Sequence, residues 1–221
     1  MKGWTMTKFI IFFSTLFSLL FVTCDARAGF KHFVRAEGDK LMDGDREYRF
    51  ISFNIPNLHM IEDQMPFDEI QAWRLPDTYE LNDALETVSQ MGGQVVRIYA
   101  ITVKRPDDLP DTPKHVLGPG QFNEEAFQAL DNMMAIAAKH GIRVIIPLMD
   151  NWPWMGGRAE YAGFRKKDKD EFWSDPELRK DFKETVRYLI NRTNTVTGKK
   201  YCDDMAILAW ETGNELTSTP E

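Results

Sequence analysis

Four strand-like segments separated by helical patterns constrain this chain more than any other feature. Residues 142–149 and 207–210 are almost wholly apolar, as expected of strands buried on both faces of a parallel sheet. Residues 50–53 and 94–100 are the two earlier strand-like segments. Regular strand–helix alternation indicates the α/β class, and helices on one face curl such a sheet into a barrel. We therefore predict an incomplete (β/α)8 TIM barrel, made of its first four strands and three crossover helices.

The predicted crossover helices have apolar residues at helical spacing and recognisable ends. The first runs from Thr78 to the stop at Gly92-Gly93, and Asn123 caps the second, which ends at Gly141. The third starts at the capping-box sequence of residues 174–177. We also predict a β-hairpin at the barrel's lower end around Asp43-Gly44, and loops at 102–120 and 150–173.

The N-terminus has the order of a secretory signal peptide. Lys2 and Lys8 precede an apolar run over residues 9–22, and Ala26-Arg27-Ala28 follows it. We predict a signal peptide at residues 1–28, and a protein that is secreted or periplasmic. A lipid anchor at Cys24 is the first alternative, and an uncleaved anchor or simple buried helix is the second.

Composition limits the classes of partner. The net charge is −7 and the basic residues are scattered, which argues against a nucleic-acid groove. No Cys/His cluster has metal-ligand spacing, so we predict no metal and no cofactor. After signal cleavage Cys202 is the single thiol, and we expect no stable membrane insertion. The sequence leaves the oligomeric state open.

Polar residues follow the last apolar strand. Asn214-Glu215 stand at its predicted C-terminal end, where an α/β barrel places catalytic groups. The carboxyl can protonate a glycosidic oxygen, and the amide can hold a sugar hydroxyl. The alternative is that Asn214 only turns the chain and Glu215 is only solvated.

Other strands also carry polar residues in places that need a reason. Arg97 lies within the apolar run 95–99, where it requires either a carboxylate partner or a ligand. Asn54 stands at the end of the first strand. Trp152 and Trp154 lie in the loop after the third strand, where they either stack on sugar rings or pack the loop.

Five motifs together resemble glycoside hydrolase family 5, in particular its endo-β-1,4-mannanase branch. They are VRIYA at 96–100, FNEEAF at 122–127, PLMDNW at 147–152, NRTNTVTG at 191–198 and LAWETGNE at 208–215. The resemblance implies a retaining β-glycanase on a (β/α)8 barrel that acts on a polysaccharide without a catalytic metal. It implies that Glu215 is the acid/base, that Asn214 holds the substrate's 2-hydroxyl, and that Arg97 orients the nucleophile.

The resemblance also suggests substrate-binding residues. Asn54, Tyr99 and Trp152 match positions that line the family's substrate cleft, and Asn151 lies in the same matching motif as Trp152. Trp154 is added to the substrate-binding set because its loop setting suggests exposure. Glu211 also fits the motif, and we interpret it as a buried partner for Arg97.

Two departures from the family pattern affect the prediction. This chain has Thr212-Gly213 and Leu216 around Asn214-Glu215, where the mannanase-like sequence usually has Leu-Ala and Pro, so the exact substrate stays open. Residues 29–221 are also short of the roughly 250 of a complete barrel, and the family's nucleophile arrives on its seventh strand. We therefore expect the N-terminal part of a catalytic domain, truncated after strand 4 and nearly or wholly inactive by itself.

Three functions remain in view at this stage. The first is an endo-acting β-1,4-mannanase. The second is a β-1,4-glucanase or an exo-β-mannosidase of the same family. The third is a non-catalytic glycan-binding remnant, in which Trp152 and Trp154 still hold sugar.

Overall fold

The computed structural model describes residues 29–62 and 72–217. The predicted signal peptide, 1–28, lies outside the described residues. The strands are β1 Val34–Glu37, β2 Lys40–Asp43, β3 Arg46–Glu47, β4 Ser52–Asn54, β5 Ile61–Glu62, β6 Trp73–Arg74, β7 Val95–Arg97, β8 Val116–Gly118, β9 Gln121–Phe122, β10 Arg143–Pro147 and β11 Ile207–Glu211. The helices are α2 Thr78–Gln90, α3 Glu124–Lys139, α4 Arg158–Phe164 and α5 Pro176–Asn191, with 3-10 turns η1 Pro56–Leu58, η2 Lys169–Glu171 and η3 Tyr201–Asp203.

A four-stranded parallel sheet is the centre of the molecule. Its order is β11-β10-β7-β4, so each strand lies beside the next one in the sequence. This is the arrangement of consecutive strands in a barrel wall, and the α/β class with a parallel sheet is confirmed. Within the described residues the sheet does not close, because β4 and β11 each have a neighbour on one side only.

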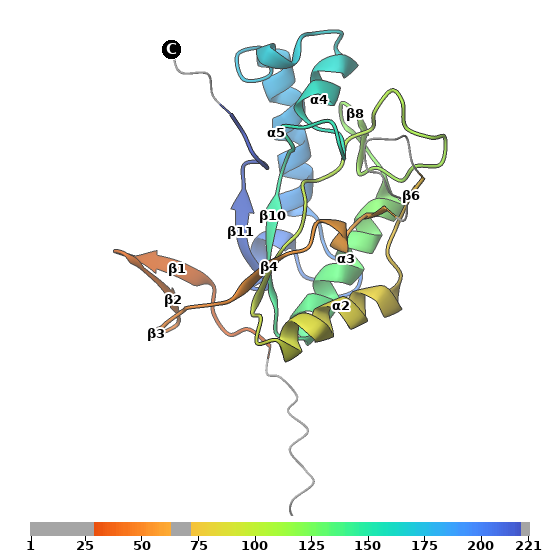
Figure 1. The fold of residues 1–221 in the computed structure, drawn as a ribbon. Helices are drawn as coiled ribbons and strands as arrows, with labels where there is room; N and C mark the ends of the chain where they lie inside the picture. Colours follow the sequence, from red (N-terminus) through yellow and green to blue (C-terminus); the bar gives the residue numbers. More distant parts are fainter. Residues whose placement is uncertain (1–28, 63–71, 218–221) are drawn as a thin grey trace, which may run out of the picture.

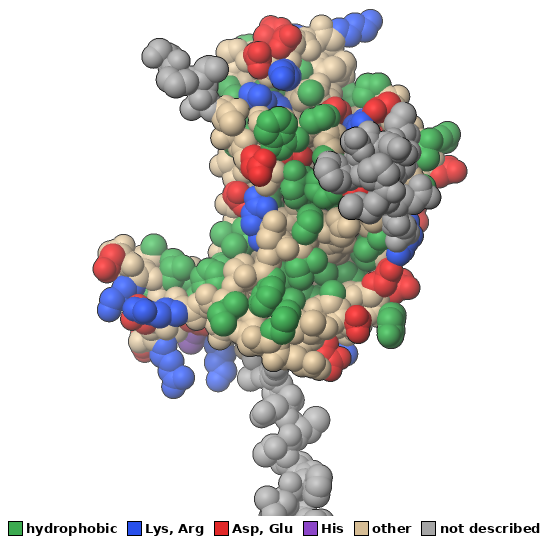
Figure 2. Space-filling model, viewed as in Figure 1, with side chains coloured by type: hydrophobic (Ala, Val, Ile, Leu, Met, Phe, Trp, Pro, Cys, Tyr) green, Lys and Arg blue, Asp and Glu red, His purple; other side chains and the backbone are tan. Residues whose placement is uncertain are grey.

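The helices cover one face of this sheet (Figure 1). Their inner sides form the main core with alternate strand residues. Buried members of this core include Leu81, Leu85, Val88, Val96, Ile98, Phe127, Leu130, Met134, Val144 and Ile146. The other face is more open, and Ser52 and Ala209 on it are exposed. Figure 2 shows this side of the molecule hollowed between the β1–β3 sheet and the body.

The first two predicted helices both have side-chain caps, of which only Asn123 was predicted from the sequence. Asp77 caps α2 in a reciprocal capping box with Glu80, and the Asn123 side chain accepts from the backbone N of Glu125 at 3.1 Å. In α5 the cap is Asp175, whose carboxylate accepts from the backbone N of Glu177, and not Ser174. Helix α5 ends at Asn191.

Several local predictions are wrong in detail. The predicted hairpin is a three-stranded antiparallel meander, because a second turn with Gly38 at φ 61° precedes the one at Gly44. The predicted loop 102–120 contains most of a two-stranded sheet, β8–β9. The predicted loop 150–173 contains helix α4. The last crossover therefore has two α-helices instead of one.

The meander is attached at the N-terminal end of β10. The guanidinium of Arg143 is buried, donates to Asp43 at 2.8 Å and to the backbone O of His32 at 3.1 Å, and lies over the ring of Phe30 at 4.2 Å. Figure 1 shows the meander projecting to one side at this end of the sheet. The opposite end, where the strands finish, is therefore left clear of it.

A buried ion cluster ties α3 to the segment after α5. Arg192 bonds Asp131 at 2.9 and 2.7 Å, and Asp131 is fully buried. Tyr201 and Thr195 also donate to the carboxylate of Asp131. This network fixes the chain that leads into β11. Among the described residues, none of the helices has the length and apolar character required to span a bilayer.

Candidate active site

The C-terminal ends of three strands bring the predicted polar residues together. Asn54 and Arg97 are direct neighbours in the register of β4 and β7, and Glu211 ends β11. Because parallel strands present their carboxyl ends at one edge, these side chains meet although they come from distant parts of the chain.

Arg97 and Glu211 form a two-point ion pair. Arg97 Nε lies 2.7 Å from Glu211 Oε2, and Nη2 lies 2.9 Å from Oε1. The guanidinium also donates to Asn54 Oδ1 at 3.3 Å. The hydrogen bond to Glu211 raises the pKa of Arg97. The charge in the apolar strand is thus neutralised by a carboxylate, which is one of the two kinds of partner that the sequence allowed, and the carboxylate is that of Glu211, as interpreted from the motif.

Asn214 is held from both sides of its amide. Its Oδ1 accepts from Arg97 Nη2 at 3.1 Å. Its Nδ2 donates to the Tyr99 hydroxyl at 2.8 Å and to Asp150 Oδ1 at 3.1 Å. Arg97, Tyr99 and Asn214, all predicted from sequence, are therefore in direct contact.

The turn after β11 is fastened to the loop after β10. The backbone N of Asn214 donates to Met149 O at 2.7 Å, and that of Asn151 donates to Asn214 O at 3.2 Å. Gly213 permits this approach, because a Cβ there would lie 2.6 Å from Met149 O. Glu215 then has a φ of 49°, which is rare for a residue with a side chain. The geometry that aims Glu215 is therefore set by backbone pairing.

Glu215 and Trp152 contact each other at the surface. The Trp152 indole N–H donates to Glu215 Oε2 at 2.5 Å. Both residues are exposed, and 49% of Trp152 is accessible. An exposed indole face beside a carboxyl is suited to contact with a sugar ring.

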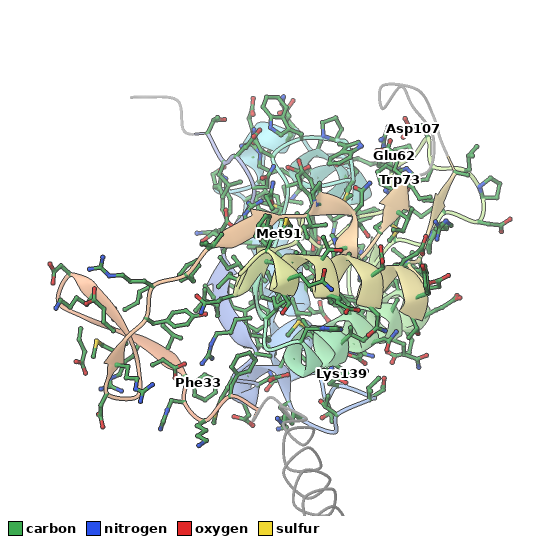
Figure 3. All side chains as sticks on the ribbon, turned by 60° about the horizontal axis from the view of Figure 1, so that its bottom comes forward. Phe33, Glu62, Trp73, Met91, Asp107 and Lys139 are labelled. Atoms are coloured by element: carbon green, nitrogen blue, oxygen red, sulfur yellow. The ribbon has the colours of Figure 1, made fainter. Side chains whose placement is uncertain are left out.

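Trp154 is more enclosed than its loop setting suggested. Its indole donates to Glu62 Oε2 at 3.2 Å, and its ring lies edge-on to Trp73 and Tyr99, with centroids 5.8 and 4.8 Å away. Figure 3 shows Glu62 and Trp73 close together at one end of the molecule, far from Phe33. The expectation of an exposed Trp154 is wrong, and its contacts favour the loop-packing alternative.

Asp150 is a site residue that sequence reasoning missed. It is fully buried, and burial raises the pKa of its carboxyl, against a hydrogen bond from Asn214 that lowers it. The available signal was its place directly after the apolar strand 142–149. The neighbouring Asn151, predicted to bind substrate, has a buried Oδ1 without a hydrogen-bond partner among the described residues.

No group of three or more His, Cys, Asp or Glu with metal-binding geometry exists in the part of the chain that the structure describes. The chemical resources of the site are thus a carboxyl at Glu215, an amide at Asn214, an ion pair behind them and aromatic rings beside them.

A parallel barrel-type sheet with carboxyl and amide groups at its strand ends is the arrangement of a (β/α)8 glycoside hydrolase. Comparison with known proteins gives the family. Residues 31–220 match the model described as "GH family 5 beta-mannosidase-like". The chain belongs to this family, and the resemblance drawn from its motifs is confirmed.

Relatives and solved structures agree with this assignment. The chain is 34% identical over 188 residues to mannan endo-1,4-beta-mannosidase 8 of Oryza sativa subsp. japonica, covering 82% of this chain and 46% of the relative. The endo-beta-1,4-mannanase of Thermotoga petrophila matches with a TM-score of 0.66 and 28% identity, covering 78% of this chain and 36% of that one.

The glycoside hydrolase family 5 mannosidase from Rhizomucor miehei matches in fold, with a TM-score of 0.71 at 22% identity, covering 85% of this chain and 50% of that one. The chain thus spans about half the length of the curated relatives it matches.

Proposed function

We propose that this chain carries the acid/base part of a retaining, endo-acting β-glycanase that hydrolyses β-1,4-mannan-type polysaccharide. The single observation that carries the proposal is the contact network in which Arg97 and Tyr99 both bind the side chain of Asn214. Asn214 directly precedes Glu215 in the sequence, so the network lies beside the proposed acid/base. Its support from the comparisons is the repeated match to endo-1,4-beta-mannosidases.

Each residue has a distinct proposed task. Glu215 protonates the departing glycosidic oxygen and later activates water, as an acid/base does in retaining hydrolysis. Asn214 holds the substrate's 2-hydroxyl, next to the reacting carbon, and Arg97 orients the nucleophile. Asn54, Tyr99, Asn151 and Trp152 are proposed to contact substrate, with Trp154 supporting the wall behind Tyr99.

We further propose that the 221-residue chain by itself turns over little or no substrate. Retaining chemistry needs a second carboxylate about 5 Å from the acid. Glu211, which lies in the same network, is engaged at both oxygens by Arg97. The family resemblance implies that the nucleophile belongs to a later strand than the four of the parallel sheet.

The alternatives differ in what they predict. A β-1,4-glucanase would prefer cellulose, and an exo-β-mannosidase would release single mannose units from chain ends. A non-catalytic remnant would bind oligosaccharide through Trp152, which is exposed, without cleaving it.

The test compares hydrolysis of mannan and cellulose by the 221-residue chain and by the longest product of its gene that contains it. We expect mannan cleavage into oligosaccharides by the longer product and little or none by the shorter. In the longer product, Glu215→Gln should lower the rate by about 10²–10⁴-fold. Glu86→Gln, an exposed change on α2, is the matched control.

Three results would contradict parts of the proposal. Full turnover by the 221-residue chain would remove the claim of inactivity. Cellulose preferred over mannan would favour the glucanase. An unchanged rate in Glu215→Gln would remove Glu215 from its proposed role.

For localisation we propose secretion or export to a periplasm after cleavage behind Ala28, with a lipid anchor at Cys24 as the alternative. The mass of the mature N-terminal peptide distinguishes them, because a lipidated product begins at a modified Cys24 and a cleaved one at Gly29.

A further inference from the structure

Asp150 is a buried carboxyl directly behind the Asn214 amide. None of its surface is exposed, and Oδ1 accepts from Asn214 Nδ2 at 3.1 Å. Its backbone is fixed as well, because its carbonyl accepts from Arg158 N at 3.0 Å and it forms a parallel bridge with Asn214. Its position relative to Asn214 is therefore set by backbone as well as side-chain contacts.

The two ends of the Asn214 amide face groups of opposite character. Arg97 has only donors, so it requires Oδ1 on its side. An ionised Asp150 has only acceptors, so it requires the NH2 on the other side. A flipped amide would place donor against donor and acceptor against acceptor. Arg97 and Asp150 thus select one orientation of Asn214 together.

Asp150 also decides which amide hydrogen is available. Asn214 Nδ2 has two hydrogens. One is donated to Asp150 Oδ1, and the other is donated to the Tyr99 hydroxyl, which lies 2.8 Å from Nδ2. A carboxylate is a stronger acceptor than a neutral hydroxyl. A sugar hydroxyl entering the site can therefore replace Tyr99 more readily than it can replace Asp150.

We propose that Asp150 is a positioning residue for Asn214, which locks the amide so that the hydrogen now on Tyr99 is the one presented to a sugar hydroxyl. That the ligand is a sugar rests on the proposed function, but the fixed orientation of the Asn214 amide is a property of the free protein.

The titratable groups around this amide are few. Arg97 and Tyr99 both have raised pKa values, Arg97 mainly through Glu211 and Tyr99 mainly through burial, so neither changes charge in acid. Glu211 and Glu215 are the other carboxyls nearby, and they contact Arg97 and Trp152. A pH-dependent change at the Asn214 amide that is caused by Asp150 must therefore vanish when Asp150 alone is replaced.

The experiment records the side-chain NH2 signals of Asn214 by NMR in the 15N-labelled chain from neutral to acid pH. Asn214→Asp identifies the signals. We expect them to shift with pH, with a midpoint above that of an ordinary Asp because burial raises the pKa of Asp150. Asp150→Asn should leave the signals near their neutral-pH positions, since an amide oxygen replaces Oδ1, and should abolish that shift. Asp150→Ala should move them already at neutral pH.

Binding of mannohexaose provides the second measurement. We expect Asp150→Ala to weaken it by about tenfold or more, because the Asn214 amide loses a hydrogen bond to a charged group. Asp150→Asn should restore most of the affinity, because its amide oxygen can still accept from Asn214 Nδ2. Asp83→Asn, an exposed change on α2, is the control.

The outcomes separate the two proposals. Asn214 signals that keep titrating in Asp150→Asn, or that stay unmoved in a folded Asp150→Ala, overturn the positioning role. Unaltered protein that fails to bind mannohexaose counts against the proposed function, and the NH2 signals still decide the role of Asp150.

Discussion

The indole N–H of Trp152 donates to the carboxylate of Glu215 at 2.5 Å, across the gap between the loop after β10 and the turn after β11. These residues are distant in the sequence and adjacent at the strand ends. The contact joins an aromatic surface to the proposed acid/base, so a ligand that stacks on Trp152 lies within reach of Glu215.

Replacing Trp152 should remove the aromatic surface beside Glu215. In the unaltered chain, we expect mannohexaose to change the tryptophan emission, because the exposed indole of Trp152 lies on the proposed sugar-binding surface. Trp152→Phe should remove most of that change and weaken binding, since the smaller ring offers less area for stacking. The measurement is a fluorescence titration with mannohexaose. Trp173→Phe, another exposed tryptophan, is the control, and equal responses in the two variants would contradict the assignment.

The Arg97–Glu211 pair should stabilise the fold as well as the site. In Arg97→Met, the half-buried carboxylate of Glu211 loses the guanidinium that binds both of its oxygens. We expect a loss of about 1.5–3 kcal/mol in the free energy of unfolding, the range for hydrogen bonds to charged groups. Arg97→Lys should recover part of it, because an ammonium cannot reproduce the bidentate geometry. Urea unfolding measures the effect, and identical midpoints for all three proteins would refute it.

Gly213 should be intolerant of any side chain. An alanine Cβ would lie 2.6 Å from Met149 O, so either the turn or the end of β10 must move. We expect Gly213→Ala to cost about 1–3 kcal/mol, as overpacking does, and to impair oligosaccharide binding by displacing Asn214 and Glu215. The matched change is Gly163→Ala in α4, where an added Cβ has no neighbour within 4 Å. Similar stability of the two variants would argue against a steric role for Gly213.

Stability should fall in acid partly through Glu124. Hydrogen bonding to Arg192 lowers the pKa of Glu124 from 4.5 to about 2. Because the folded value is the lower one, the stabilisation is complete above about pH 4.5 and is lost as the pH falls towards 2. Glu124→Gln should therefore flatten the dependence of the unfolding midpoint on pH in this window. Glu125→Gln, its exposed neighbour, should leave the dependence unchanged.

Local sequence signals predicted the regular elements well where the signal was complete. The helix over Thr78–Gln90 has an Asp cap, a reciprocal Glu and a terminating glycine pair, and it forms as predicted. Helix α4 was missed because Gly157 caps it without a side chain, and the backbone N–H of Gly157 donates to the Glu160 carboxylate instead. A start signal that lacks the usual capping residue is hard to recognise in the sequence alone.

The sequence by itself determined that a parallel sheet forms, that Arg97 needs either a carboxylate or a ligand, and that Asn214-Glu215 stand at a strand end. These follow from periodicity and from the cost of burying a charge, which are local properties. Only the tertiary structure decided that Glu211 binds Arg97 through both carboxylate oxygens, that Asp150 lies behind Asn214, and that Trp154 packs against Trp73. Which side chains meet depends on strand register and loop approach, and these are set by packing between segments far apart in the chain.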